Sequence, residues 1–88
     1  MNIQLNTKQT ELLSLLSKKY GFEYKYLLKD SIAVVKYFEN IEELCSVINE
    51  EYMMKGINSN WEPNAYGLEL NDLLNMVNKL RIDSSKHL

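Results

Sequence analysis

The sequence predicts a small α+β domain whose elements follow one another in the order α-β-β-α-α, with a two-stranded hairpin packed on the helices. Two observations predict this fold class. Apolar side chains recur at helical spacing near both ends of the chain, while residues 22–28 alternate largely with the period of a strand. At 88 residues and 45% hydrophobic composition, the chain suits one thin-cored domain spanning residues 1–88. An all-α bundle of three or four helices is the alternative interpretation.

The first helix is predicted over residues 7–20. Asn6 and Gln9 have the spacing of a capping box, in which each satisfies a free backbone N–H of the other. Gly21 follows, and glycine readily takes the left-handed conformation that ends a helix. The apolar face is supplied by leucines: Leu12, Leu13, Leu15 and Leu16.

A β-hairpin is predicted over residues 22–38, which are rich in aromatic and β-branched side chains, with a turn at residues 29–31. The competing interpretation is one long helix from Ser31, because the later apolar side chains also step by three and four. Asn40 and Glu43 have the spacing of a second capping box, which would be wasted inside such a helix. The hairpin is therefore preferred.

The second helix is then predicted over residues 41–55, with Gly56 as its end. Its inward face is expected to consist of Ile41, Leu44, Cys45, Ile48 and Tyr52. Two glutamate pairs are expected to face mostly water, namely Glu42, Glu43, Glu50 and Glu51.

A loop is predicted over residues 57–67, followed by a last helix capped by Asn71. The tail after about residue 82 is expected to fray, because it has few apolar side chains to order it. The apolar stripe of this helix consists of Leu70, Leu73, Leu74, Val77 and Leu80.

Composition narrows the classes of function. The formal net charge is −2, and the chain contains a single arginine, so strong binding to nucleic acid phosphates is not expected. One cysteine allows no internal disulfide, and the first residues lack the pattern of a secretory signal, so a cytoplasmic location is expected. No apolar run is long enough to cross a membrane. The lysine and asparagine bias is typical of AT-rich coding in low-GC bacteria and their phages.

The chain shows no phosphate-binding loop, nucleophile elbow or metal-ligand motif, so no catalytic, metal or cofactor site is predicted. Cys45 falls on the apolar stripe of the second helix and is expected to pack in the core as an inert thiol. His87 lies second from the end, where no rigid element would position it.

A protein-binding surface is the remaining hypothesis. The residues assigned to it are Glu42, Glu43, Glu50, Glu51, Trp61 and Tyr66. Tryptophan and tyrosine are enriched at the centres of interfaces, and an acidic helix face would attract a basic partner. For Trp61 the preferred interpretation is nevertheless a lid over the small core, between the last two helices.

We therefore expect a small non-catalytic module that binds another protein, such as an immunity protein or antitoxin that neutralises a basic, nuclease-type toxin. A phage-encoded inhibitor of a host defence enzyme would have the same physical features. A different class of function is single-stranded nucleic-acid binding by the lysines and aromatic rings of the hairpin. The sequence leaves the oligomeric state open.

Overall fold

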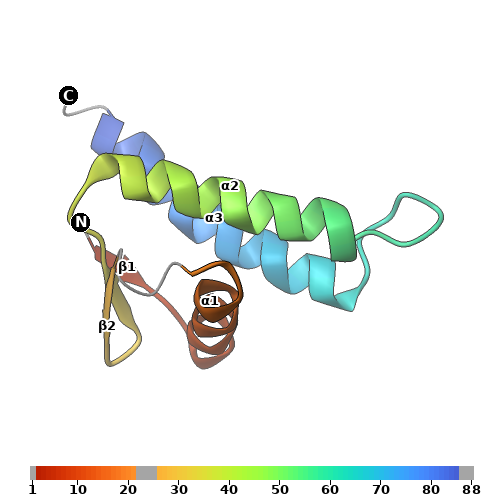
Figure 1. Ribbon diagram of the computed structural model, residues 1–88, viewed down its shortest axis with the longest axis horizontal. Coiled ribbons are helices and arrows are strands. Elements are labelled where there is room, and N and C mark those ends of the chain that lie inside the picture. Colours follow the sequence, from red (N-terminus) through yellow and green to blue (C-terminus); the bar gives the residue numbers. More distant parts are fainter. Residues whose placement is uncertain (1, 22–25, 86–88) are drawn as a thin grey trace.

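The computed structural model describes residues 2–21 and 26–85, with side chains up to Ile82, and it has the predicted α+β architecture (Figure 1). The predicted order of one helix, a hairpin and two helices is confirmed, and a strand that was not predicted precedes it. The sheet contradicts the all-α alternative. The elements are β1 (Asn2–Gln4), α1 (Thr7–Tyr20), β2 (Leu27–Lys29), β3 (Ile32–Val34), α2 (Phe38–Lys55) and α3 (Ala65–Ser85).

Helix α1 has the predicted bounds, because local signals determine both of its ends. The Asn6 side chain accepts a hydrogen bond from the Gln9 backbone N–H, and the Gln9 side chain accepts one from Asn6. Gly21 ends the helix with a φ of 71°, in the left-handed region where a side chain would be strained.

The three strands form an antiparallel sheet in the order β1-β3-β2. The hairpin turn falls where it was predicted, and both of its central residues, Asp30 and Ser31, have positive φ values of 51° and 66°. Two such residues make the turn that matches the natural twist of paired strands. The first part of the predicted hairpin, residues 22–25, lies outside the described residues.

Strand β1 was missed by the prediction, although its sequence carries a short signal. Ile3 and Leu5 are buried and alternate with exposed polar residues, as in a half-buried strand. Ile3 pairs with Ala33 of β3, and the Leu5 N–H donates to the Ser31 carbonyl at 2.8 Å. Three residues are too short a run for periodicity to distinguish a strand from a coil.

Helix α2 begins at Phe38, three residues before the predicted start, so the Asn40–Glu43 capping box is wrong as a helix start. Its N-cap is Tyr37, whose side chain makes no capping hydrogen bond. Phe38 is partly buried against the core, and this apolar contact favours the early helix start although no side chain caps it. The predicted end is correct, because Gly56 closes the helix with its N–H on the Tyr52 carbonyl.

Helix α3 also begins early, at Ala65 rather than after Asn71, so the predicted cap at Asn71 is wrong. Asn64 is the cap instead, because its side-chain oxygen accepts from the Gly67 N–H at 2.7 Å. The same side chain donates from its nitrogen to the Lys55 carbonyl at 2.9 Å. One asparagine therefore satisfies backbone groups at the end of α2 and at the start of α3.

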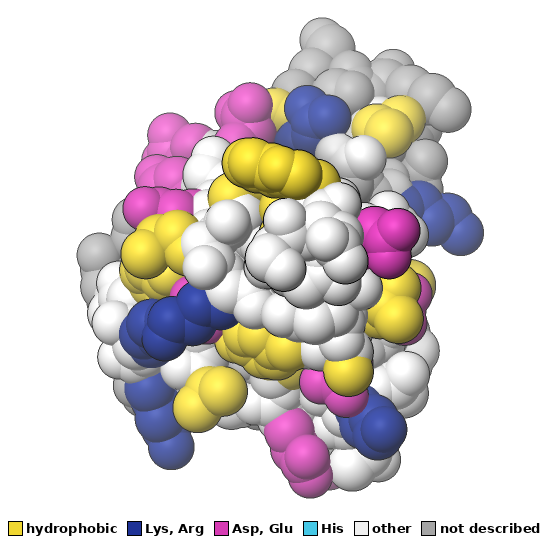
Figure 2. All heavy atoms as spheres, turned by 90° about the vertical axis from the view of Figure 1, so that its right-hand side faces the viewer, with side chains coloured by type: hydrophobic (Ala, Val, Ile, Leu, Met, Phe, Trp, Pro, Cys, Tyr) yellow, Lys and Arg dark blue, Asp and Glu magenta, His cyan; other side chains and the backbone are white. Residues whose placement is uncertain are grey.

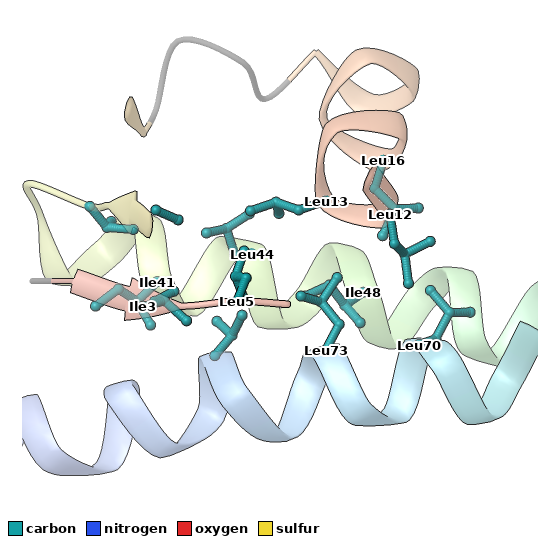
Figure 3. Close-up of a cluster of buried hydrophobic side chains, with 13 residues drawn as sticks. Ile3, Leu5, Leu12, Leu13, Leu16, Ile41, Leu44, Ile48, Leu70 and Leu73 are labelled. Atoms are coloured by element: carbon teal, nitrogen blue, oxygen red, sulfur yellow. The ribbon is translucent and has the colours of Figure 1, made fainter. Parts of the chain in front are cut away.

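The core lies between the α2–α3 pair and a second layer made of the sheet and α1 (Figure 1). Helices α2 and α3 run side by side, and the sheet and α1 cover one side of this pair. Figure 3 shows leucine and isoleucine side chains from both layers meeting in the space between them. The predicted stripes of α2 and α3 supply this core through Ile41, Leu44, Ile48, Leu70, Leu73 and Val77.

Candidate functional site

Four glutamates of α2 are exposed along the helix, and they are called the α2 glutamates below: Glu39, Glu42, Glu43 and Glu50. Three of them were predicted to face water, and the structure places them there. Ser46 and Val47 continue the same surface and, with the first three glutamates, line an open hollow of about 520 Å³. Within the described residues, α2 offers only Lys55 as a balancing cation.

The fifth glutamate, Glu51, does not belong to this surface. Its exposed fraction is 2%, which contradicts the predicted solvated position. One carboxylate oxygen accepts from the Lys19 ammonium at 2.7 Å and from the Tyr20 hydroxyl at 3.0 Å, and the other accepts from the Tyr66 hydroxyl at 2.8 Å. The cluster of Lys19, Tyr20, Glu51 and Tyr66 therefore joins α1, α2 and α3, and we call it the Glu51 cluster.

The electrostatics of the Glu51 cluster favour its charged carboxylate. Burial raises the pKa of the Glu51 carboxyl, but hydrogen bonds from Lys19, Tyr66 and Tyr20 outweigh it, so the pKa is lower than usual. The pKa of the Tyr66 hydroxyl is raised to about 12 by burial and by its bond to Glu51. The hydrogen bond to Glu51 raises the pKa of Lys19. The cluster holds one carboxylate, one ammonium and two neutral phenols at neutral pH.

Tyr66, which was predicted to lie on the contact surface, is only partly exposed. It lies in the first turn of α3, is half-buried, and directs its hydroxyl inward to Glu51. A hydroxyl bonded to a buried carboxylate at 2.8 Å serves the packing of the three helices. Glu51 is therefore corrected from an exposed residue to a buried one, while Tyr66 is half-buried with its hydroxyl directed inward.

Trp61 is exposed, and the preferred interpretation of this side chain as a lid over the core is wrong. Its exposed fraction is 84%. Its φ of 64° lies in the left-handed region, which is uncommon for a bulky residue. The loop between α2 and α3 projects beyond the ends of both helices, away from the rest of the molecule (Figure 1). The core on the α2–α3 pair is covered by side chains of the sheet and α1, such as Ile3 and Leu13, so it does not need the tryptophan as a cover.

Hydrogen bonds fix the loop that carries Trp61. The Asn58 side-chain oxygen accepts from the backbone N–H groups of Asn60 and Glu62, and the Asn58 N–H donates to the Glu62 carbonyl at 2.8 Å. The Trp61 N–H donates to the Asn58 carbonyl at 3.1 Å. Because a single asparagine organises the turn, the exposed indole is presented by ordered backbone.

The base of this loop is closed by two glycines in direct contact. A side chain on Gly67 would place its first carbon 2.0 Å from the Gly56 carbonyl oxygen, so only glycine fits there. The prediction placed Gly67 in the loop, whereas it lies in the first turn of α3. Its role is the close approach of the two helix ends, and it does not break the helix.

Figure 2 shows the end of the molecule that carries this loop. Hydrophobic side chains reach the surface there in separate places, with polar atoms and backbone between them, and acidic side chains gather along one upper edge. The large exposed hydrophobic residues near the helix ends are Met53, Met54, Trp61 and Leu68.

A second hollow of about 420 Å³ lies between α2 and α3, and we call it the outer groove. Helix α2 contributes Glu42, Cys45, Ser46 and Asn49 to its lining. Helix α3 contributes Leu74, Asn75, Asn78 and Arg81. The Arg81 side chain donates from its Nε to the Asn78 side-chain oxygen at 2.9 Å. The outer groove is therefore lined mainly by polar side chains, and it was not predicted from the sequence.

The thiol of Cys45 is half-buried in the lining of the outer groove, so the predicted packing position is confirmed only in part. Burial raises the pKa of the Cys45 thiol, while the positive charge of Arg81 lowers it and Glu42 raises it. A raised pKa keeps the thiol in its unreactive protonated form at neutral pH. His87 lies outside the described residues. The described residues contain no group of three or more His, Cys, Asp or Glu side chains that could hold a metal ion.

Most of the described aromatic rings in and next to the predicted hairpin pack inward. Tyr20, Tyr26 and Phe38 are partly buried against the core, and the Tyr26 hydroxyl lies 2.6 Å from the Ser17 hydroxyl. Tyr37 is exposed and has the Lys36 ammonium 5.5 Å from its ring centre. Phe22, Tyr24 and Lys25 lie outside the described residues, so a stacking surface is not visible in the described part of the hairpin.

Comparison of this chain with protein-family models, with curated proteins and with solved structures found no match. The helices in the described ranges include none that combines the length and the apolar character needed to span a membrane.

Proposed function

We propose that this chain is a non-catalytic protein-binding module of the cytoplasm that inhibits a basic protein by forming a one-to-one complex with it. An immunity protein or antitoxin that neutralises a nuclease-type toxin is the specific form of this proposal. A phage protein that inhibits a host defence enzyme would use the same surface.

The observation that carries the proposal is Trp61. An indole that is 84% exposed leaves a large apolar area in water, and its left-handed backbone adds strain of order 1 kcal/mol. The hydrogen bonds around Asn58 maintain this conformation, and Trp61 is not among the side chains that pack against the core. Tryptophan is the residue type most enriched among interface residues whose loss strongly weakens binding. A partner pocket that receives the indole would account for these costs.

The charge of α2 supports a basic partner. The α2 glutamates lie on the exposed surface of the helix whose C-terminal end leads directly into the Trp61 loop. Exposed charges contribute little to affinity but raise the rate of association with a surface of opposite charge. The partner expected from these features has a basic face beside an apolar pocket.

The experiment uses the tagged full-length chain to capture partners from lysates, and then the purified candidate partner in a titration. Asparagine replaces Trp61, because asparagine tolerates a positive φ better than most residues. We expect Trp61→Asn to keep the fold and to weaken the purified complex by about 2 kcal/mol or more, a factor of about 30. Glu43→Lys with Glu50→Lys should slow association and reduce its dependence on salt.

A matched control reverses two exposed charges away from α2, by Glu11→Lys with Asp72→Lys. This control should associate at nearly the wild-type rate. Wild-type affinity in Trp61→Asn, together with a wild-type rate in the α2 double variant, would exclude this surface. A complex without inhibition of the partner's activity would exclude the inhibitor function.

A further inference from the structure

The outer groove has features that the proposed function does not use. It lies on the α2–α3 pair, and its lining includes three asparagine side chains, Asn49, Asn75 and Asn78. The carboxamides of Asn49 and Asn75 have no hydrogen-bond partner within the described part of the chain. A carboxamide carries both a donor and an acceptor, which matches the alternating N–H and C=O groups of a polypeptide backbone.

The charges at the groove are also unpaired. Neither Glu42 nor Arg81 has an ion-pair partner among the described residues, and no ion pair joins the two within 4.0 Å. Glu42 also lines the neighbouring hollow together with Glu39 and Glu43, so the potential on the α2 side is negative. This arrangement favours a ligand that carries a cation on the α2 side.

The side chains that line the outer groove suit a bound polypeptide in an extended conformation better than a helical one. An amphipathic helix binds through a continuous apolar stripe, and the apolar side chains that line the outer groove, Cys45 and Leu74, are too few for that. An extended segment has unpaired backbone groups along its whole length and needs hydrogen bonds more than apolar area. The open shape of the groove also suits a chain that passes through it.

We propose that the outer groove binds an extended polypeptide segment, pairing its backbone with the three asparagine carboxamides and placing a lysine or arginine side chain beside Glu42. Arg81 retains the N–H groups that do not bond Asn78, and it donates them to backbone carbonyls of the segment. This inference rests on the proposed function, since it names the kind of segment that a basic protein partner would insert into the helix pair in addition to its contact with Trp61.

The test is a fluorescence anisotropy titration of the full chain with labelled peptides of about eight residues, blocked at both ends. Alternating lysine and threonine keeps the probe extended and cationic. A second peptide has glutamate in place of lysine, and a third has the lysine sequence with alternate backbone nitrogens methylated. We expect saturable binding of the lysine peptide, and at least tenfold weaker binding of the other two.

Variants then locate the binding. Asn75→Leu keeps the branched shape of the side chain and removes its donor and acceptor, and we expect about tenfold weaker binding of the lysine peptide. Asn71→Leu is the matched control, since Asn71 is exposed on α3 outside the outer groove, and it should bind as the wild type does. Glu42→Gln should reduce the preference for lysine over glutamate peptides.

Three results would overturn the inference: no saturable binding of the lysine peptide up to about 1 mM, equal binding of the methylated peptide, or an unchanged affinity in Asn75→Leu. These failures are separate from a failure of the proposed function, because the peptide assay does not involve Trp61. Trp61→Asn should bind the lysine peptide as the wild type does, while losing affinity for the whole partner.

Discussion

The burial of Glu51 shows which part of a single residue's environment was predictable. Position 51 lies three residues after Ile48 and seven after Leu44, so helical periodicity alone places it on the apolar side of α2. This signal was available but was overridden by the rule that glutamate faces water. Its partners could not be predicted, because Lys19 and Tyr66 come from distant helices whose packing the sequence does not reveal.

Replacing Glu51 with glutamine should destabilise the fold and change its response to acid. A hydrogen bond to a charged group is worth about 1.5–3 kcal/mol, so Glu51→Gln should lower the free energy of unfolding by about that amount at pH 7. Because folding lowers the Glu51 pKa, this contribution is complete above the ordinary glutamate pKa of about 4.3 and is lost as the pH falls further. Urea titrations between about pH 3 and 7 should therefore show the two proteins converging at low pH.

Tyr66→Phe provides the comparison at the alkaline end. The Tyr66 pKa is raised to about 12, so its contribution is complete below the ordinary tyrosine value of about 10 and is lost as the pH rises toward 12. The phenylalanine variant should lack that alkaline loss. A constant difference between wild type and Glu51→Gln at every pH would contradict the charged state assigned to the cluster.

At the scale of elements, helix ends were predicted correctly where nearby residues determine them, and wrongly where contacts with another helix do. Helix α1 was predicted residue by residue, because Asn6, Gln9 and Gly21 act within a few residues of its ends. The start of α3 was missed because Asn71 was taken as its cap and residue 64 was placed in the preceding loop. Gly67 follows Asn64 closely, and a glycine at that point favoured a loop over a helix start. Only the contact between Gly67 and Gly56 in the structure explains why a glycine lies inside the first turn of α3.

Substituting the two asparagines tests this assignment of the α3 start. Asn64→Ala removes the cap of α3 and the bond to the last turn of α2, so we expect a loss of about 1–2 kcal/mol in the free energy of unfolding. Asn71→Ala replaces an exposed residue inside the helix and should leave stability unchanged or raise it by about 0.5 kcal/mol. Thermal denaturation followed by circular dichroism measures both. If Asn71→Ala lowered the free energy of unfolding more than Asn64→Ala did, the helix start predicted from the sequence would be correct instead.

At the scale of the whole molecule, one side of the α2–α3 pair is occupied by the core and carries little information about function. The candidate binding features lie elsewhere: the α2 glutamates and the outer groove on the helix pair, and Trp61 on the loop at its end. The length and composition predicted a small domain, and the positions of the glutamates predicted an acidic helix. Neither could predict that the only tryptophan lies outside the core, because that depends on whether the sheet and α1 cover the core without it.

Because Trp61 is the only tryptophan in the sequence, its exposure to water can be measured directly by the fluorescence of the wild-type chain. A domain of this size is expected to unfold in one cooperative step, so far-ultraviolet circular dichroism should show one urea transition. Trp61 is already in water in the folded state, so its emission maximum should be close to that of free indole and should hardly shift through the same transition. Acrylamide should quench the folded and unfolded chains almost equally. A blue-shifted emission that moves to the red together with the dichroism transition would instead place the indole against the core, and it would remove the observation on which the proposed binding function rests.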